Sequence, residues 1–313
     1  MSGLTVLKAN KARPKAIQAF RPAVLGKTNT AYLYLIPLFA FLAFFTYYAM
    51  AFNVQTSFFK WNGVSKNRTF IWFDNYVRLF KDPYFSIAMK NTLLYFLVTI
   101  PVQAVFGFIL ALVFQNGRLK LRGLTRSIVF LPNIMSLVVI GYIFNNIFNI
   151  NTGAINSALR GIGLGHLTQD WLGSPTTALW IVIVANIYTY IGFSMTLYIG
   201  GIIGMPHDIM EASYIDGCSR WQNVRYITLP MLMSTHITIL IMGLVGTLKT
   251  FDIVWQITQG GPARMSEMPA TFLYRAYIIE YKAGYAAAVA VIVLLVALTM
   301  CILNLQLQKR TRI

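Results

Sequence analysis

The sequence predicts an all-α integral membrane protein that crosses a bilayer six times and has one membrane domain. Charged residues make up only 11% of the 313-residue chain, against about 25% in a typical soluble domain. Hydrophobic residues make up 57% of it and gather in long continuous runs. Because a helix needs about 20 apolar residues to cross about 30 Å of hydrocarbon, each of these runs predicts a transmembrane helix.

Six apolar runs reach this length, and they leave no room for a separate soluble domain. In chain order they are Tyr32–Phe52, Thr92–Phe114, Ile128–Phe148, Ala178–Ile203, Met231–Thr250 and Ala286–Leu307. The predicted membrane domain therefore covers residues 32–308. A basic segment, residues 1–31, precedes it, and a short tail, residues 309–313, follows it. The first run has no obvious small-residue cleavage site, which favours an uncleaved span over a signal peptide.

The net charge of +17 lies mainly in the loops and tails. Residues 1–31 contain six Lys and Arg and no acid, residues 115–126 contain four and no acid, and residues 309–313 contain three more. Basic segments favour the cytoplasmic side of a membrane. Since six spans put both ends of the chain on one side, both termini are predicted to be cytoplasmic, and this accounts for the charge better than nucleic-acid binding does. The first outer loop, residues 53–91, is also fairly basic.

The richest cluster of carboxylates lies between the fourth and fifth runs, in residues 205–230, which this topology places in the cytoplasm. Pro206 suits the start of a short helix, whose positive end favours the acids that follow. Gly217 suits a left-handed turn, and Ser219 can cap a second short helix. Two such helices form either a docking surface for a partner or an ordinary connector, and residue chemistry alone leaves both open.

The stretch EASYIDGCSRWQNVRYITLP, residues 211–230, closely resembles the cytoplasmic signature of ABC-importer permeases of the carbohydrate-uptake branch. The resemblance implies a six-span type I importer permease with a cytoplasmic coupling helix that docks an ATPase. The coupling residues that it implies are Glu211, Ala212, Asp216, Gly217, Trp221, Ile227, Leu229 and Pro230. Ser213 and Cys218 replace alanines of the signature, and both are small enough for close packing.

Three further segments support the resemblance. They are GAINSALRGIGL (153–164), followed by WLGSPTTALW, then TFDIVWQITQGGP (250–262) and YRAYIIEYKAGYAAAVA (274–290). The segment that ends in G-G-P (250–262) is characteristic of the maltose-permease-F-like member of permease pairs. The resemblance covers most of the chain after the basic segment and implies sugar uptake. Another ABC substrate class, such as an amino acid, phosphate or a peptide, is the alternative, and the individual sugar is not readable.

The sequence shows no pattern for catalysis or metal binding. It has no G-x-x-x-x-G-K-[ST] phosphate loop, and its three histidines lack metal-ligand spacing. We therefore expect no enzyme activity and no cofactor in this chain, with ATP and Mg²⁺ on a partner ATPase. The resemblance implies a second homologous permease subunit, two ATPase subunits, an extracytoplasmic solute-binding protein and a sugar, all at the cytoplasmic membrane of a bacterium.

A self-sufficient secondary transporter or channel is the alternative of a different class. Ion-coupled carriers often place Asp, Glu or His at mid-membrane. The six runs contain no acid, and their ionisable side chains are His236 and Lys249. Asp252 and Glu280 lie just outside the runs. The pattern therefore argues against proton or sodium coupling.

The fourth and fifth runs carry polar side chains that suit a sugar site. Proteins hold sugars by hydrogen bonds to a few polar side chains and by stacking on aromatic faces. Helical spacing puts Asn186 and Tyr190 on one face. The resemblance to maltose-type permeases implies sugar contacts at Asn186, Thr189 and Tyr190 in the fourth run, and at or near three positions of the fifth run. The candidate substrate-binding residues are Asn186, Thr189, Tyr190, Gly243, Thr247 and Lys249. Alternatively, Asn186 and Thr247 only join helices, and Lys249 pairs with Asp252 three residues on.

Overall fold

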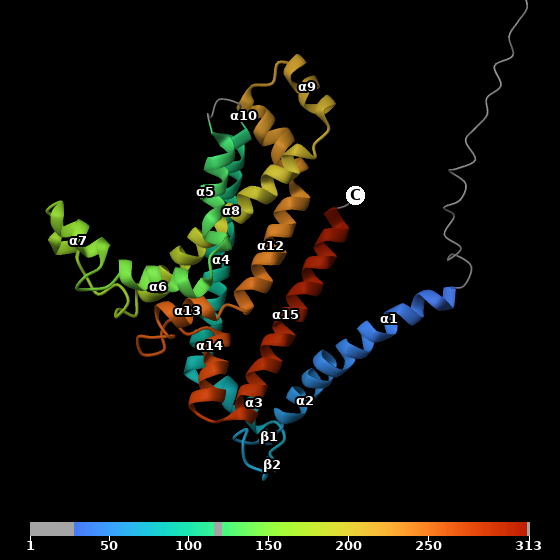
Figure 1. Cartoon of the computed structure of the whole chain (residues 1–313), viewed down its shortest axis with the longest axis vertical. Coiled ribbons are helices and arrows are strands. Elements are labelled where there is room, and N and C mark those ends of the chain that lie inside the picture. Colours follow the sequence, from blue (N-terminus) through green and yellow to red (C-terminus); the bar gives the residue numbers. More distant parts are fainter. Residues whose placement is uncertain (1–27, 116–120, 312–313) are drawn as a thin grey trace, which may run out of the picture. The chain divides into compact units, whose positions relative to one another are not determined.

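The computed structural model describes residues 28–115 and 121–311, which are mostly helical (Figure 1). The chain divides into two compact units, Met1–Phe52 and Asn53–Ile313. Most of the predicted basic segment, residues 1–27, lies outside the described residues, as do residues 116–120 of the basic loop and residues 312–313 of the predicted tail.

The first predicted span corresponds to an uninterrupted helical stretch. It consists of α1 (Thr28–Leu42), a π-helical turn (Ala43–Tyr47) and α2 (Tyr48–Thr56). Residues Tyr34–Thr56 are long and apolar enough to cross a membrane. Nearly all side chains from Tyr34 to Phe52 are exposed. A helix that is apolar all round suits a membrane or a protein interior, so lipid or another subunit is the surface that it fits.

The second unit contains the helices that correspond to the other five predicted spans. They are α4 (Pro83–Gln115), α5 (Arg122–Ile134), α6 (Leu137–Ile147), α8 (Ala178–Ile203), α12 (Met233–Leu248) and α15 (Ala283–Thr311). Among the described residues, four helices can each cross a membrane, and six spans result if two bent helix pairs count as one span each. The fourth predicted span matches α8 residue for residue. The second and sixth predicted spans lie within the longer α4 and α15.

The third predicted span, Ile128–Phe148, is wrong as one straight helix. Its residues belong to α5 and α6, which meet at a bend of 95°. Pro132 has no N–H group with which to continue the helical hydrogen-bond ladder, and Met135 is extended. Ser136 then starts α6, because its side chain accepts a hydrogen bond from the Val138 N–H group. Apolar composition predicts that residues leave water, but it does not predict that they keep one helix axis.

The fifth predicted span, Met231–Thr250, is also interrupted. Leu232 separates α11 (Leu229–Met231) from α12, and the segment Arg220–Met231 is bent by 60° from α12. The residues that lead into this span are therefore continuous with the short helices before it. The bend lies where the signature stretch ends.

Short elements lie at the two ends of the bundle (Figure 1). One end carries α9 (His207–Ile215), α10 (Arg220–Asn223) and a π-helical turn (Val224–Thr228). The opposite end carries α3 (Asp74–Lys81), α14 (Pro269–Tyr274), a second π-helical turn (Arg275–Ile279) and an antiparallel hairpin of β1 (Phe59–Lys60) and β2 (Thr69–Phe70). α13 (Asp252–Ile257), α7 (Ala154–Gly161) and a 3₁₀ turn (Gly165–Leu167) complete the described elements.

Two buried clusters fix the long helices around α8. One joins α4, α6, α8 and α13 through residues such as Ile140, Ile183 and Val254. The other joins α4, α8 and α12 through residues such as Ala111 and Met195. The helices approach closely, and a Cβ on Gly192 of α8 would lie only 2.3 Å from the Val129 carbonyl oxygen of α5. A cavity lies where the two clusters meet.

Candidate functional site

The signature stretch folds as a helix–turn–helix hairpin, as its turn and cap residues predict. Pro206 immediately precedes α9, and Gly217 has a left-handed φ of +77°. Ser219 caps α10: its Oγ accepts from the Gln222 N–H group at 3.3 Å, and its own N–H group donates to Gln222 Oε1 at 2.8 Å. This reciprocal pair satisfies two otherwise free donors at a helix start. The hairpin is therefore a defined local structure.

A buried polar cluster holds the two helices of the hairpin together. The Ser213 hydroxyl donates to the Met210 carbonyl at 2.7 Å and lies 2.6 Å from the Asn223 amide nitrogen, which donates to it. Thr228 donates to the Asn223 amide oxygen at 3.1 Å. Ser213, Asn223 and Thr228 are all less than 5% exposed. The serine that departs from the signature thus ties α9 to α10, a role that its small size alone did not predict.

The hairpin exposes charged and large apolar side chains together. Five of the predicted coupling residues lie on it and are exposed: Glu211, Ala212, Asp216, Gly217 and Trp221. Their exposed neighbours include Tyr214, Ile215 and Tyr226, and Ile215 is 86% exposed. The other three predicted coupling residues, Ile227, Leu229 and Pro230, continue towards α12. Exposed apolar groups rimmed by charge mark protein interaction sites.

His236 connects the end of the signature stretch to the bundle. Its Nε2 lies 3.2 Å from the Leu229 carbonyl oxygen, and its Nδ1 lies 2.8 Å from the Tyr198 hydroxyl of α8. Sequence reasoning treated His236 only as an ionisable group in a span. Its contacts instead join the signature stretch, α12 and α8 at the 60° bend.

The cavity between the two buried clusters has a volume of about 380 Å³ and is lined by α4, α8, α12 and their neighbours. Five of the six candidate substrate-binding residues line it: Asn186, Tyr190, Gly243, Thr247 and Lys249. Thr189 does not. Its side chain is 1% exposed and donates to the Ala185 carbonyl of its own helix at 2.7 Å. Successive helical residues point in different directions, so Thr189 turns away from the cavity that Tyr190 faces.

Five polar residues of the cavity were not among the candidate substrate-binding residues: Tyr95, Gln103, Asn133, Ser194 and Thr250. Gln103 is 4% exposed and donates to the Asn186 amide oxygen at 2.9 Å. The Tyr95 hydroxyl is buried and makes no hydrogen bond of good geometry within the described part of the chain, although Asn186 lies near it. A glutamine inside a predicted span was a usable signal, because such a group needs a partner. Tyr95 gave none.

Lys249 does not pair with Asp252, contrary to the interpretation as an i, i+3 ion pair. Helix α12 ends at Leu248 and α13 begins at Asp252, so the two residues are not on one helix. Lys249 instead follows the last turn of α12 and lines the cavity. A cation at this place is favoured by the negative end of the helix.

A buried ion cluster holds the loop between α13 and α14. Glu267 is fully buried and accepts from Arg264 Nε at 2.5 Å and from Arg275 Nε at 3.0 Å. Arg275 also donates to the Gln259 carbonyl at 2.7 Å. Buried carboxylates persist when they are paired in this way. The G-G-P segment is therefore part of a firmly held structure at the end of the bundle opposite to the hairpin.

Comparison with known proteins identifies the fold and its family. Residues 92–313 match the family described as binding-protein-dependent transport system inner membrane component. The probable ABC transporter permease protein YurN of Bacillus subtilis (strain 168) is 36% identical over 279 residues, 89% of this chain and 95% of that protein. The lactose transport system permease protein LacF of Rhizobium radiobacter is 32% identical over 270 residues, 85% of this chain and 90% of that protein.

A solved structure extends the match to three dimensions. The crystal structure of a bacterial ABC transporter involved in the import of the acidic polysaccharide alginate superimposes with a TM-score of 0.78 at 25% identity, over 90% of this chain and 95% of that one. The predicted type I importer permease fold is thereby confirmed. The chain belongs to the family of binding-protein-dependent transport system inner membrane components, the permeases of ABC transporters.

Proposed function

We propose that this chain is the transmembrane permease subunit of an ATP-driven importer for a sugar or oligosaccharide and forms half of its translocation pathway. The cavity around Asn186 carries the proposal. Its tyrosines, amides and apolar walls provide the directional hydrogen bonds and aromatic faces that bind sugars. Relatives named for lactose and for alginate support a saccharide over an amino acid, phosphate or a peptide.

The partners follow from what one permease subunit lacks. The sequence has no phosphate loop, so ATP and Mg²⁺ belong to two separate ATPase subunits. A second homologous permease would complete the pathway, and the family name supports an extracytoplasmic solute-binding protein as the sugar donor. The complex would lie in the cytoplasmic membrane of a bacterium with both termini of this chain, and its hairpin, in the cytoplasm.

The hairpin is the surface through which the ATPase would act. It is held by the Ser213–Asn223 hydrogen bond and can therefore move as one body. Glu211 and Asp216 would set its register in a groove of the ATPase, while Trp221 and its apolar neighbours seat it. Closure of the ATPases on ATP would then shift the bundle between inward-open and outward-open states.

The cavity assignment is tested by uptake in vesicles that contain the assembled complex, its cognate binding protein and a panel of sugars. Asn186→Ala and Tyr190→Ala should each reduce uptake of the transported sugar. Losing one satisfied polar contact costs about 1–3 kcal/mol, which corresponds to about 5- to 150-fold weaker binding. Thr189→Val is the matched control, because it changes a neighbouring residue that faces away from the cavity.

Assembly is checked by co-purification of all subunits. Normal uptake by both cavity variants, or an equal loss in Thr189→Val, would remove the cavity as the sugar site. ATP-independent uptake driven by a proton or sodium gradient would instead revive the secondary-transporter alternative.

A further inference from the structure

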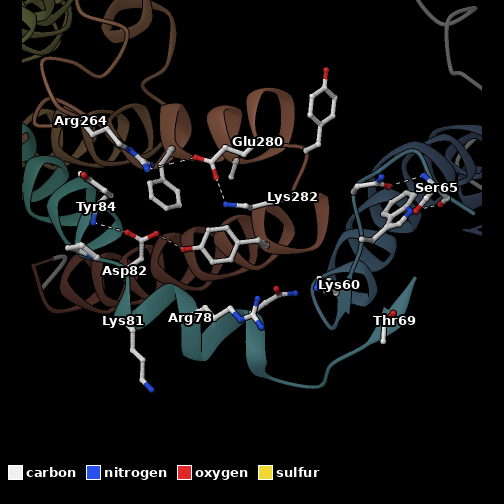
Figure 2. A pocket seen from close by; sticks show the side chains of 18 of the residues that line it. Lys60, Ser65, Thr69, Arg78, Lys81, Asp82, Tyr84, Arg264, Glu280 and Lys282 are labelled. Carbon is white, nitrogen blue, oxygen red and sulfur yellow. Dashed lines mark hydrogen bonds and ion pairs between the residues drawn. The ribbon is translucent and has the colours of Figure 1, made fainter. Parts of the chain in front are cut away.

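A second cavity lies apart from the cavity around Asn186. It has a volume of about 910 Å³ and is lined by residues of the β1–β2 hairpin, α3 and the start of α15, among others (Figure 2). These elements lie at the end of the bundle opposite to the α9–α10 hairpin (Figure 1). We call this second cavity the outer pocket. None of the residues that line it also lines the cavity around Asn186. A partner or ligand in this pocket would therefore not occupy the cavity around Asn186.

The outer pocket is rich in cations. Its charged lining residues are Lys60, Arg78, Lys81, Arg264 and Lys282, with Asp82 and Glu280 as the only acids among them. Three of these cations are paired with carboxylates: Arg78 with Asp74, Lys282 with Glu280, and Arg264 with Glu267. Within the described residues, Lys60 and Lys81 have no carboxylate partner.

The walls of the pocket are built before any partner binds. Asn75 is 4% exposed, and its amide donates to the Ser57 and Phe59 carbonyls at 2.7 and 3.0 Å. The Tyr285 hydroxyl donates to Asp82 at 2.9 Å, which joins α15 to the end of α3. In Figure 2 the Arg78 and Lys282 side chains extend towards the space between these elements, while the Lys81 amine points away from it at the rim. A preformed pocket spares a partner the cost of ordering it.

Membrane topology does not account for these basic residues. Residues 53–91 contain six Lys and Arg against two Asp. In the proposed orientation this segment is outside the cell, where short loops usually carry fewer Lys and Arg than cytoplasmic ones. The excess of cations therefore runs against the pattern that inserts the chain. An acidic partner on the outer side would account for it.

We propose that the outer pocket receives acidic side chains of the solute-binding protein when that protein docks to deliver the sugar. This inference rests on the proposed function and on its orientation. Trp61, Tyr84 and Tyr281 also line the pocket, and aromatic residues together with arginine are enriched in protein interfaces. The unpaired Lys60 and Lys81 supply the net attraction. Charges at such a rim act mainly on the rate of encounter and make it dependent on salt.

The experiment uses the assembled transporter in lipid nanodiscs with its cognate binding protein, loaded with the transported sugar. The readout is the binding-protein concentration that gives half-maximal ATP hydrolysis, at low and at high salt. In the Lys60→Glu/Lys81→Glu double variant, that concentration should rise roughly tenfold or more at low salt. The maximal rate should stay unchanged, and the difference should shrink at high salt because exposed charges are then screened.

Lys66→Glu is the matched control, because Lys66 is exposed on the same loop but does not line the pocket. An unchanged half-maximal concentration in the double variant, or an equal rise in Lys66→Glu, would overturn the inference. If the double variant does not assemble, the neutral Lys60→Gln/Lys81→Gln variant is measured in the same way. Stimulation of the wild-type complex by the binding protein tests the proposed function separately.

An anionic lipid headgroup is the competing occupant. The same titration in nanodiscs of neutral phosphatidylcholine and of anionic phosphatidylglycerol separates the two. A shift present in both lipids supports docking of the binding protein. A shift that appears only with phosphatidylglycerol would assign the pocket to a headgroup and overturn the inference.

Discussion

Replacing Gly217 isolates the contribution of one backbone angle to coupling. The residue has a φ of +77°, and at this turn the N–H groups of Gly217 and Cys218 close the end of α9 by donating to the Tyr214 and Ser213 carbonyls at 3.2 and 3.0 Å. No atom beyond its chain neighbours lies within 4 Å of the position that a Cβ would occupy. A substitution therefore causes no clash with the rest of the protein, and its cost is conformational.

That cost can be ranked by side chain. A left-handed conformation costs an ordinary residue about 1–2 kcal/mol, while asparagine tolerates it better. For a β-branched residue it is a true outlier. Gly217→Ala should thus lower the population of the native hairpin about 5- to 30-fold relative to competing conformations. Gly217→Asn should have the smallest effect and Gly217→Val the largest.

The assay is ATP hydrolysis stimulated by the sugar-loaded binding protein in the assembled complex, together with hydrogen exchange of the hairpin amides. Stimulated hydrolysis and amide protection should fall in the order Asn, Ala, Val. Sugar capture by the separate binding protein should stay unchanged. The reasoning is refuted if Gly217→Val couples as well as the wild type, or if Gly217→Asn is as damaging as Gly217→Val.

Three further predictions concern the hairpin and its orientation. Glu211→Ala should weaken co-purification with the ATPase and reduce uptake, because a hydrogen bond to a charged group contributes about 1.5–3 kcal/mol; full coupled uptake would contradict this. Ser213→Ala and Asn223→Ala should each destabilise the hairpin by about 1–3 kcal/mol, as measured by hydrogen exchange, and strictly additive losses in the double variant would contradict a direct contact. In a variant without native cysteines, Ser65→Cys should react with an impermeant thiol reagent applied outside and Arg220→Cys should not; the reverse pattern would overturn the orientation.

Features that depend on local chemistry could be predicted from the sequence. Apolar length alone placed the span at Ala178–Ile203, because burial in hydrocarbon demands an uninterrupted run. Gly217 indicated the turn of the hairpin, and Ser219 indicated the start of its second helix. Both predictions succeed because a left-handed glycine and a serine N-cap depend only on residues three or four positions away. Asn186 and Tyr190 share a helix face, and both line the cavity.

Features that depend on packing between distant segments could not be predicted. Gln103 and Asn186 are 83 residues apart, so nothing near either one indicates their hydrogen bond. The 95° bend between α5 and α6 lies in an apolar run whose composition gives no axis direction. Nothing in the sequence indicates that Glu267 is buried, because its burial depends on contacts with Arg264 and Arg275 that only the folded loop brings together.

The contacts of α12 show how movement of the hairpin would reach the cavity around Asn186. The helix begins at the 60° bend beside the signature stretch, and it carries Gly243 and Thr247 at the cavity. His236, one turn into the helix, contacts the Leu229 carbonyl on one side and Tyr198 of α8 on the other. Under the proposed mechanism, a pull on the hairpin that keeps these contacts would move α12 together with α8. The cavity would then change shape because its α4 wall, which carries Tyr95 and Gln103, does not share these contacts. A change between α8 and α12 themselves would require a change in the bend at Leu232 or the loss of the Tyr198–His236 contact.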